Sequence, residues 1–302
     1  MNGRSIPPIF LFTRVICAAI LLATMSPACA RADGLDLPEV FDWSDNRIDY
    51  HWGPNFREPS VSDSKGNGQD VQKHVVTFAH LDGYAWGSNL LIVDYLLSDR
   101  HDPAEHSTDG AYEVYGVYRH DFGYSKIFGT GDPLSPLVKE VSLQWGADAN
   151  VKNTAFGSQK LMPVAGVGIV WNLPFLFKTS LLWDKEWNRN GISHKSVNYD
   201  STARFESVWA VPFPLWNRAL QFEGFAVINA PKGRDGFGAQ TKTEYLVHPK
   251  LMVDVGRDLF DQAKRLYLGL GYEHWNNKFG VDHTTNAGAE ANAVFIEASI
   301  HF

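Results

Sequence analysis

Ser299 and His301 are the residues whose types and spacing come closest to catalytic chemistry. A serine hydroxyl becomes a nucleophile when a histidine accepts its proton, and an acidic side chain then orients the imidazole. The two residues stand two positions apart, so they share one face of an extended segment. Any polar row of a strand shows the same alternation, and no spacing supplies the third, acidic member. We therefore expect no catalytic residues and no enzymatic activity.

Motifs for metal ions and phosphates are also weak. The stretch "DSKGNG" at 63–68 resembles a calcium loop, but Lys65 replaces its third-position Asp or Asn and His74 its closing Glu. The 11 histidines show no H-E-x-x-H spacing. Neither "GVGIVW" nor "GRDGFG" precedes a predicted helix, as a phosphate-binding loop would. We predict no metal site and no cofactor.

The N-terminus predicts export. Basic residues, an apolar stretch ("VICAAILLATM") and small residues ("SPACARAD") form a signal peptide over 1–32, with cleavage after Ala30 or Ala32. A lipoprotein signal would modify Cys29, but the leucine expected three residues before it is absent. The remaining chain, 33–302, is predicted to be a single domain.

Cysteine usage and charge exclude several functions. Both cysteines, Cys17 and Cys29, lie in the predicted signal peptide, which leaves no thiol for a disulfide or a metal site. The formal net charge is -7 and the pI about 5.9, which argues against nucleic acid as a partner.

Membrane-spanning helices are not indicated, since no apolar run after the leader reaches ~18 residues and the mean hydropathy is -0.22. A soluble periplasmic protein and a transmembrane β-barrel both remain, because barrel strands carry only alternate apolar residues. Twelve period-two segments rich in β-branched and aromatic residues follow the leader. They cover 48–57, 74–83, 87–98, 111–122, 138–148, 161–172, 175–186, 202–212, 219–229, 240–250, 264–275 and 293–302.

The links between these segments alternate in length. Long polar links follow the odd-numbered segments, whereas tight turns such as "GYAW" and "NLP" follow segments two and six. The links after segments four and ten are longer than this rule prefers, and "GRDLFDQAKRLY" in the latter is the best helical candidate. Long loops outside and short turns inside are typical of outer-membrane barrels. We predict an all-β, up-and-down antiparallel barrel of about 12 strands, in the bacterial outer membrane, with both termini in the periplasm.

Tryptophans support this orientation, because aromatic residues gather at both membrane interfaces. Trp171, Trp209 and Trp216 fall at the predicted periplasmic ends of segments, and Trp145, Trp183 and Trp187 fall toward the outer ends. The alternative is that these are core residues of a soluble β-sandwich.

The row opposite the apolar row would line the lumen. We expect the following residues there: Glu113, Tyr115, Arg119, Glu140, Gln144, Lys178, Arg204, Glu206, Glu223, Phe225, Lys242, Glu244, Tyr267, Glu273 and Glu297. Acids outnumber bases in this set. Some of these charges could be ion pairs that only satisfy one another. Carboxylates that accept hydroxyl protons, beside aromatic ring faces, would suit a neutral solute with a flat base and a sugar.

Several stretches resemble the Tsx-like family of nucleoside-specific outer-membrane channels, which includes the OmpK-type porins. They are "WGPNFREP", "AYEVYGVYRH", "VGIVWNLPFLFKTSLLWDKEWN", "WAVPFPLWNRALQFEGF" and "LYLGLGYEHWNN". The resemblance implies a monomeric twelve-stranded barrel that passes nucleosides through a narrow pore. It implies wall positions at Tyr115, Arg119, Lys178, Glu223 and Phe225.

The last segment, "AVFIEASIHF", alternates to the final residue. We expect Val294, Ile296, Ala298 and Ile300 to face lipid and Glu297 to face the channel. A terminal aromatic residue, Phe302, predicts recognition by the outer-membrane assembly machinery, and lipid and lipopolysaccharide would surround the wall. Two alternatives to a passive channel remain: a barrel enzyme acting on lipid, and a surface adhesin or phage receptor.

Overall fold

The computed structural model describes residues 41–131, 133–192, 194–216 and 218–302. The predicted signal peptide and its cleavage sites lie outside these residues. The described strands are β1 (Trp43–Phe56), β2 (Val71–Tyr84), β3 (Gly87–Ser98), β4 (Tyr112–Gly123), β5 (Val138–Lys152), β6 (Gln159–Trp171), β7 (Leu176–Asp184), β8 (Trp187–Asn190), β9 (Lys195–Asn198), β10 (Thr202–Leu215), β11 (Arg218–Asn229), β12 (Glu244–Asp254), β13 (Leu266–Asn276) and β14 (Glu290–His301). Four short helical turns complete the described elements: α2 (Tyr124–Phe128), α3 (Gly256–Phe260), η1 (Lys278–Gly280) and η2 (Ala287–Ala289).

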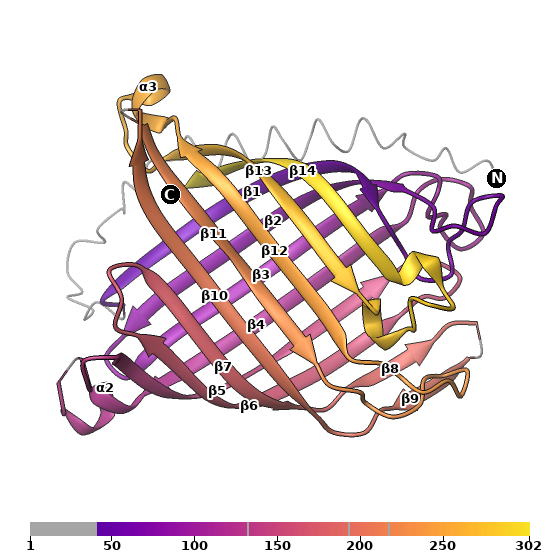
Figure 1. Cartoon of the computed structure of the whole chain (residues 1–302), viewed down its shortest axis with the longest axis horizontal. Coiled ribbons are helices and arrows are strands. Elements are labelled where there is room, and N and C mark those ends of the chain that lie inside the picture. Colours follow the sequence, from indigo (N-terminus) through magenta and orange to yellow (C-terminus); the bar gives the residue numbers. More distant parts are fainter. Residues whose placement is uncertain (1–40, 132, 193, 217) are drawn as a thin grey trace, which may run out of the picture. The chain divides into compact units, whose positions relative to one another are not determined.

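The strands form one closed antiparallel ring (Figure 1). Each wall strand pairs with its neighbour in the order β1, β2, β3, β4, β5, β6, β7, β10, β11, β12, β13, β14, and β14 pairs back with β1. β8 continues the β7 side of β6 and forms a hairpin with β9. The wall therefore has twelve positions, and the predicted twelve-stranded up-and-down barrel is confirmed. Closure leaves no unpaired strand edge in the wall.

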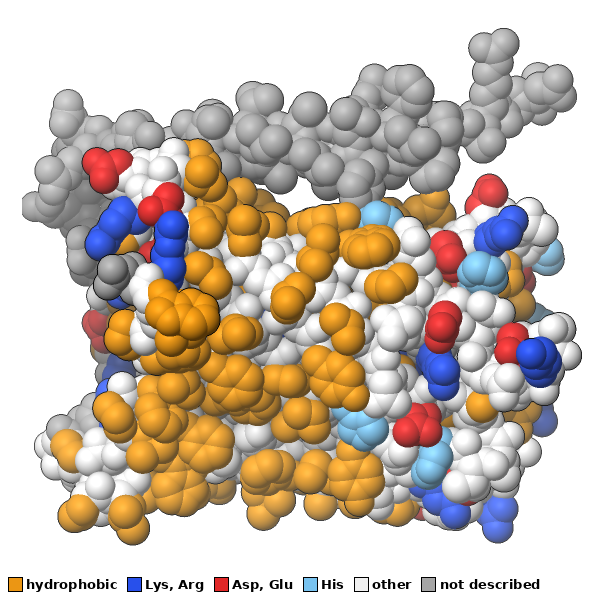
Figure 2. Space-filling model, turned by 45° about the horizontal axis from the view of Figure 1, so that its top comes forward, with side chains coloured by type: hydrophobic (Ala, Val, Ile, Leu, Met, Phe, Trp, Pro, Cys, Tyr) orange, Lys and Arg blue, Asp and Glu red, His pale blue; other side chains and the backbone are white. Residues whose placement is uncertain are grey.

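Burial alternates along the strands in the sense expected for a barrel in lipid. On β14, Val294 is 53% exposed on the outer face, whereas Phe295 is 1% exposed on the inner face. Glu297 is also buried inside, as predicted. Figure 2 shows apolar side chains dominating the wall on one face, with charged side chains gathered at its two ends. A closed barrel with an apolar exterior is the form in which strands cross a membrane, and such barrels occupy the bacterial outer membrane.

Among the described residues, no helix combines the length and apolarity needed to cross a membrane.

The two ends of the barrel differ. At one end, the links 85–86, 172–175 and 216–217 are short, and α2 and α3 lie in the two longer links. We call this the short-turn end. β1 begins and β14 ends here. The other end carries the loops 57–70, 99–111, 230–243 and 277–289, together with the β8–β9 hairpin; we call it the long-loop end. That the short-turn end faces the periplasm remains a prediction.

Several strand boundaries differ from the predicted ones; β1, for example, begins at Trp43 rather than at residue 48. β5 continues to Lys152 and β6 begins at Gln159, so their link is shorter than expected. The reason is that Asp148 and Asn150 face inward while Ala149 and Val151 face outward, an alternation hidden by small and polar residue types. β12 begins at Glu244, so Lys242 lies in the preceding loop, where it pairs with Asp282 at 3.3 Å. The prediction of Lys242 as a wall residue is therefore wrong.

The tryptophan prediction holds only in part. Trp171 ends β6 and Trp216 follows β10 at the short-turn end, and Trp187 lies in β8 toward the long-loop end. Trp145 and Trp209 lie near the middles of β5 and β10 instead, because both strands extend further than their apolar patterns suggested.

Candidate functional site: the barrel lumen

All ten predicted binding residues lie on inward-facing positions. Paired positions on adjacent strands share a face, so the inward face can be followed from Glu297 around the wall through its strand pairs. The ten residues are Tyr115 and Arg119 on β4, Lys178 on β7, Glu206 on β10, Glu223 and Phe225 on β11, Glu244 on β12, Tyr267 and Glu273 on β13, and Glu297 on β14. Their role in binding a solute remains a prediction.

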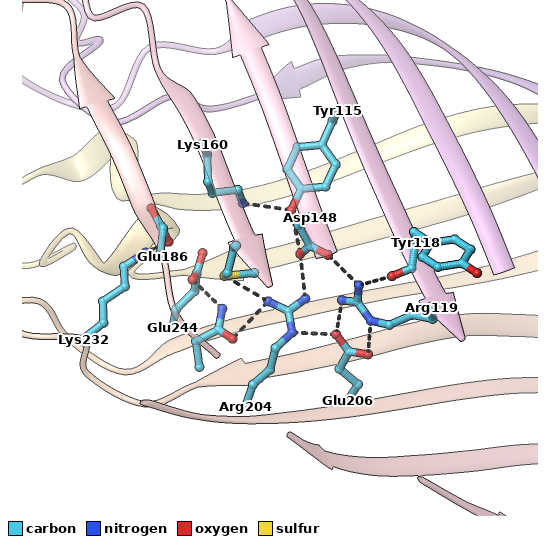
Figure 3. Close-up of polar contacts among 12 residues, drawn as sticks. Tyr115, Tyr118, Arg119, Asp148, Lys160, Glu186, Arg204, Glu206, Lys232 and Glu244 are labelled. Carbon is cyan, nitrogen blue, oxygen red and sulfur yellow. Dashed lines mark hydrogen bonds and ion pairs between the residues drawn. The ribbon is translucent and has the colours of Figure 1, made fainter. Parts of the chain in front are cut away.

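The first inward cluster joins β4, β5 and β10 (Figure 3). Arg119 binds both carboxylate oxygens of Glu206, at 2.6 and 3.1 Å, and lies 2.8 Å from Asp148. Arg204 lies 2.5 Å from Glu206 and 3.2 Å from Asp148. In the ring, β5, β6 and β7 lie between β4 and β10, so the two strands are a third of the circumference apart. The contacts between them therefore cross the lumen directly, and we call such a crossing a chord. We call these four residues the Arg119 cluster.

The floor beneath the Arg119 cluster is made of small residues. Gly166 and Gly168 face inward on β6, between the strands that the cluster joins. A Cβ at Gly168 would lie 2.7 Å from the hydroxyl of Ser142 and 3.1 Å from Cε of Lys178. A side chain larger than hydrogen at Gly168 would therefore displace its inward neighbours. Lys178 itself pairs with Asp121 of β4 at 2.5 Å.

Asp148 is the member of the Arg119 cluster that sequence reasoning missed. Both arginines contact its carboxylate, and Tyr115 donates a hydrogen bond to it at 3.1 Å. Lys160 in turn donates to the Tyr115 hydroxyl at 2.9 Å. Asp148 is the last residue of the predicted segment 138–148, just before a stretch that we predicted to be a loop. Because Asp148 lies four residues after Gln144, strand alternation places both on the same inward face, and this spacing could have identified it.

A second inward cluster joins β1, β11, β12 and β14. Lys250 lies 3.0 Å from Glu223 and 2.5 Å from Glu297, and Arg47 lies 3.1 Å from Asp49. Arg47 also approaches Glu223 at 3.8 Å, across the positions of β14, β13 and β12. This Lys250 cluster is a second chord inside the lumen, over the inward Gly269 and Gly271 of β13.

The remaining predicted residues have local partners. Glu244 accepts hydrogen bonds from Trp275 and from Asn229, each at 2.8 Å. The Tyr267 ring lies 5.2 Å from that of His301. Glu273 approaches His248 at 3.6 Å. The alternative that wall charges satisfy one another thus applies to most of the charged candidates.

An aromatic row crosses the inner wall beside the Lys250 cluster. Phe225 stacks on His248 with ring centroids 5.0 Å apart and planes 11° apart. His248 lies 4.7 Å from Phe295, which lies 4.8 Å from His51. Phe225 faces inward yet is 36% exposed, and its inward neighbour Val208 is exposed as well. Part of the Phe225 side chain therefore remains accessible within the lumen.

A buried ion cluster crosses the mouth at the long-loop end. Glu58, in the loop after β1, is 4% exposed and contacts three ammonium groups: Lys73, Lys152 at 3.2 Å and Lys278 at 3.1 Å. Lys152 also lies 2.7 Å from Asp102. Lys152 ends β5 and Lys278 follows β13, and these strands stand six positions apart in the twelve-membered ring. The loop 57–70 thus folds inward and links opposite sides of the mouth. We call this the Glu58 cluster.

Burial alone would raise the pKa of Glu58, but Lys152, Lys278 and Lys73 outweigh it and hold the pKa well below its ordinary value. The carboxylate is therefore charged throughout the neutral range. The neighbouring "DSKGNG" stretch forms a turn: Asp63 accepts hydrogen bonds from the backbone amides of Lys65 and Asn67, each at 2.8 Å. No group of acidic or histidine side chains suited to a metal ion occurs among the described residues.

Ser299 and His301 do meet an acidic residue inside the lumen. The hydroxyl of Ser299 lies 3.3 Å from Nε2 of His301, whose Nδ1 lies 3.0 Å from Asp45. The order Ser–His–Asp resembles that of a hydrolase triad. However, Ser299 is 3% exposed and donates a closer hydrogen bond to Asp49. In this arrangement the Ser299 hydroxyl directs its proton to Asp49 rather than to His301.

Acidic side chains predominate on the inner wall. Beyond the predicted residues, inward positions hold Asp45, Asp49, Asp94, Asp121, Asp148, Asp184 and Asp254, against Arg47, Lys73, Lys152, Lys160 and Lys250. A lumen with this excess raises the local concentration of cations and disfavours anions.

No family model and no curated protein matches the chain. Solved structures with similar folds include the translocator domain of the autotransporter NalP from Neisseria meningitidis, at 11% identity and a TM-score of 0.46, covering 96% of this chain and 98% of that one. The NanC porin is 11% identical with a TM-score of 0.45, covering 84% of this chain and 98% of that one. OccK5 from Pseudomonas aeruginosa is 8% identical with a TM-score of 0.29, covering 88% and 99%. Similarity at these levels identifies neither a family nor a function, and the barrel topology rests on the strand pairing above.

Proposed function

We propose that the barrel is a monomeric channel for passive diffusion of nucleosides and similar small neutral solutes, without catalytic activity. The observation that carries this proposal is the aromatic row, in which the inward Phe225 stays partly exposed inside a wall rich in carboxylates. A flat base stacks on such a ring with a gain of about 1 to 3 kcal/mol. Sugar hydroxyls donate to carboxylate lone pairs that the ion pairs leave free.

The solute class follows from what the lumen disfavours. Its acidic excess opposes phosphates and other anions, so a nucleoside suits it better than a nucleotide. Weak contacts at several points are needed for conduction, because a single tight site would trap the solute. The resemblance to the Tsx-like channels implies the same substrate class.

Planar-bilayer conductance tests the proposal. Adenosine and thymidine should reduce the current through the full-length protein, and Phe225→Ala should raise the half-blocking concentration by about fivefold to a hundredfold, the equivalent of one stacking contact. Phe222→Ala, three residues away on the outward face of β11, is the matched control and should block like the wild type. A current unaffected by both nucleosides would exclude this substrate class.

A further inference from the structure

The outer wall carries a groove near the long-loop end. Its volume is about 650 Å³, within the range of small-molecule sites. Consecutive strand pairs place Val93, Gly116, Ala149, Leu161 and Trp187 in one row across five strands. Gly116 and Ala149 form a low floor between larger side chains. This row is on the outward face, where lipid rather than the lumen is the neighbour.

The rim of the groove is polar and cationic. Asn188, Arg189, Ser196 and Asn198 of the β8–β9 hairpin line it on the side of the long-loop end, and no carboxylate occurs among its lining residues. Arg189 is exposed, and no ion pair connects it to any described residue. An apolar trough below and a free guanidinium above match an acyl chain joined to an anionic headgroup.

We propose that this groove binds a phosphorylated glycolipid of the outer leaflet, with one acyl chain over Gly116 and a phosphate on Arg189. Guanidinium groups bind phosphate in a bidentate manner. The apolar contact alone would not select this lipid. Every lipid has similar acyl chains, and replacing one acyl chain in the groove by another changes the buried apolar surface little. Selection therefore comes from Arg189. The inference depends on the long-loop end facing outward, and not on which solute the lumen passes.

The floor offers a clean substitution. A Cβ at Gly116 would meet no atom closer than 3.9 Å, so Gly116→Leu fills the groove without a clash in the wall. Ala226→Leu, at another outward position on β11, is the matched apolar control. Arg189→Ala removes the phosphate contact, and Arg218→Ala, which pairs with Asp258 at the opposite end, is its control.

Native mass spectrometry of the full-length protein in detergent would measure retention of bisphosphorylated lipid A, phosphatidylglycerol and phosphatidylethanolamine. We expect preferential retention of lipid A by the wild type and both controls. Gly116→Leu should lower it about tenfold, and Arg189→Ala about tenfold for lipid A with phosphatidylethanolamine unchanged, as for one charge-assisted contact. Equal retention of phosphatidylglycerol and lipid A, or either groove variant behaving like its control, would overturn the proposal. If Gly116→Leu fails to fold, Arg189→Ala decides alone.

Discussion

Glu58 offers the sharpest test of how the mouth is held. The Glu58→Gln substitution keeps the shape of the side chain. It leaves Lys152 with Asp102 as its ion-pair partner, and it removes the ion pair that each of Lys73 and Lys278 makes among the described residues. Removing one partner of a buried ion pair costs about 3 to 5 kcal/mol. A cost of about 4 kcal/mol lowers the ratio of closed to open loop about a thousandfold.

Single-channel recording would detect this change. We expect Glu58→Gln to show a larger and noisier current than the wild type, because the loop 57–70 leaves the mouth. Glu105→Gln is the matched control. Glu105 lies in the loop 99–111, its side chain is 53% exposed, and its ion pair with a described residue is with the exposed His106. Identical currents for Glu58→Gln, Glu105→Gln and the wild type would refute the inference that the Glu58 cluster holds the loop 57–70 across the mouth.

Acidification provides an independent test of the same carboxylate. The folded-state pKa of Glu58 lies well below that of an unfolded chain, which is about 4.3. Its contribution to loop closure is therefore fully present above about pH 4.3 and is lost as the pH falls through the lower folded value. The wild-type current should stay constant from pH 7 to about pH 4.5 and rise only in stronger acid. A rise near pH 6 would point to a different titrating group.

Three further predictions concern the lumen. Glu206→Gln leaves Arg119 and Arg204 facing each other beside Asp148 alone, so the midpoint of thermal unfolding should fall, with a loss of about 3 kcal/mol; an unchanged midpoint would contradict the chord. The acidic excess predicts cation selectivity, measured as the reversal potential in a potassium chloride gradient, and anion selectivity would show that buried ion pairs mask the wall charge. Ser299→Ala should leave both conductance and the absence of esterase and lipase activity unchanged; activity in the wild type that this variant abolishes would establish the hydrolase instead.

The sequence predicted the strands of the wall and the face on which their residues lie, but it did not predict which side chains pair with one another inside the lumen. Period-two alternation predicts on which face Glu223 or Glu297 lies, because side-chain direction is a local property of a strand. Which cation meets each carboxylate depends on ring closure and strand tilt, which bring β1 near β11 only in three dimensions. Glu58 was hidden for a related reason: a loop that folds into the mouth is as polar in sequence as one that extends into water. Its contacts with Lys152 and Lys278 arise only after the barrel closes.

The inward glycines show where a local signal does report on the lumen. Gly166 and Gly168 lie under the Arg119 cluster, and Gly269 and Gly271 lie on β13 beneath the Lys250 cluster. A Cβ at Gly271 would come within 2.0 Å of the Phe295 ring, so any larger residue would displace the aromatic row. Each set of ion pairs that crosses the lumen thus passes over a strand with two inward glycines, which leave space for the long side chains above them. A G-x-G alternation in an inward row accordingly marks the strand over which long side chains from its neighbours bridge the channel.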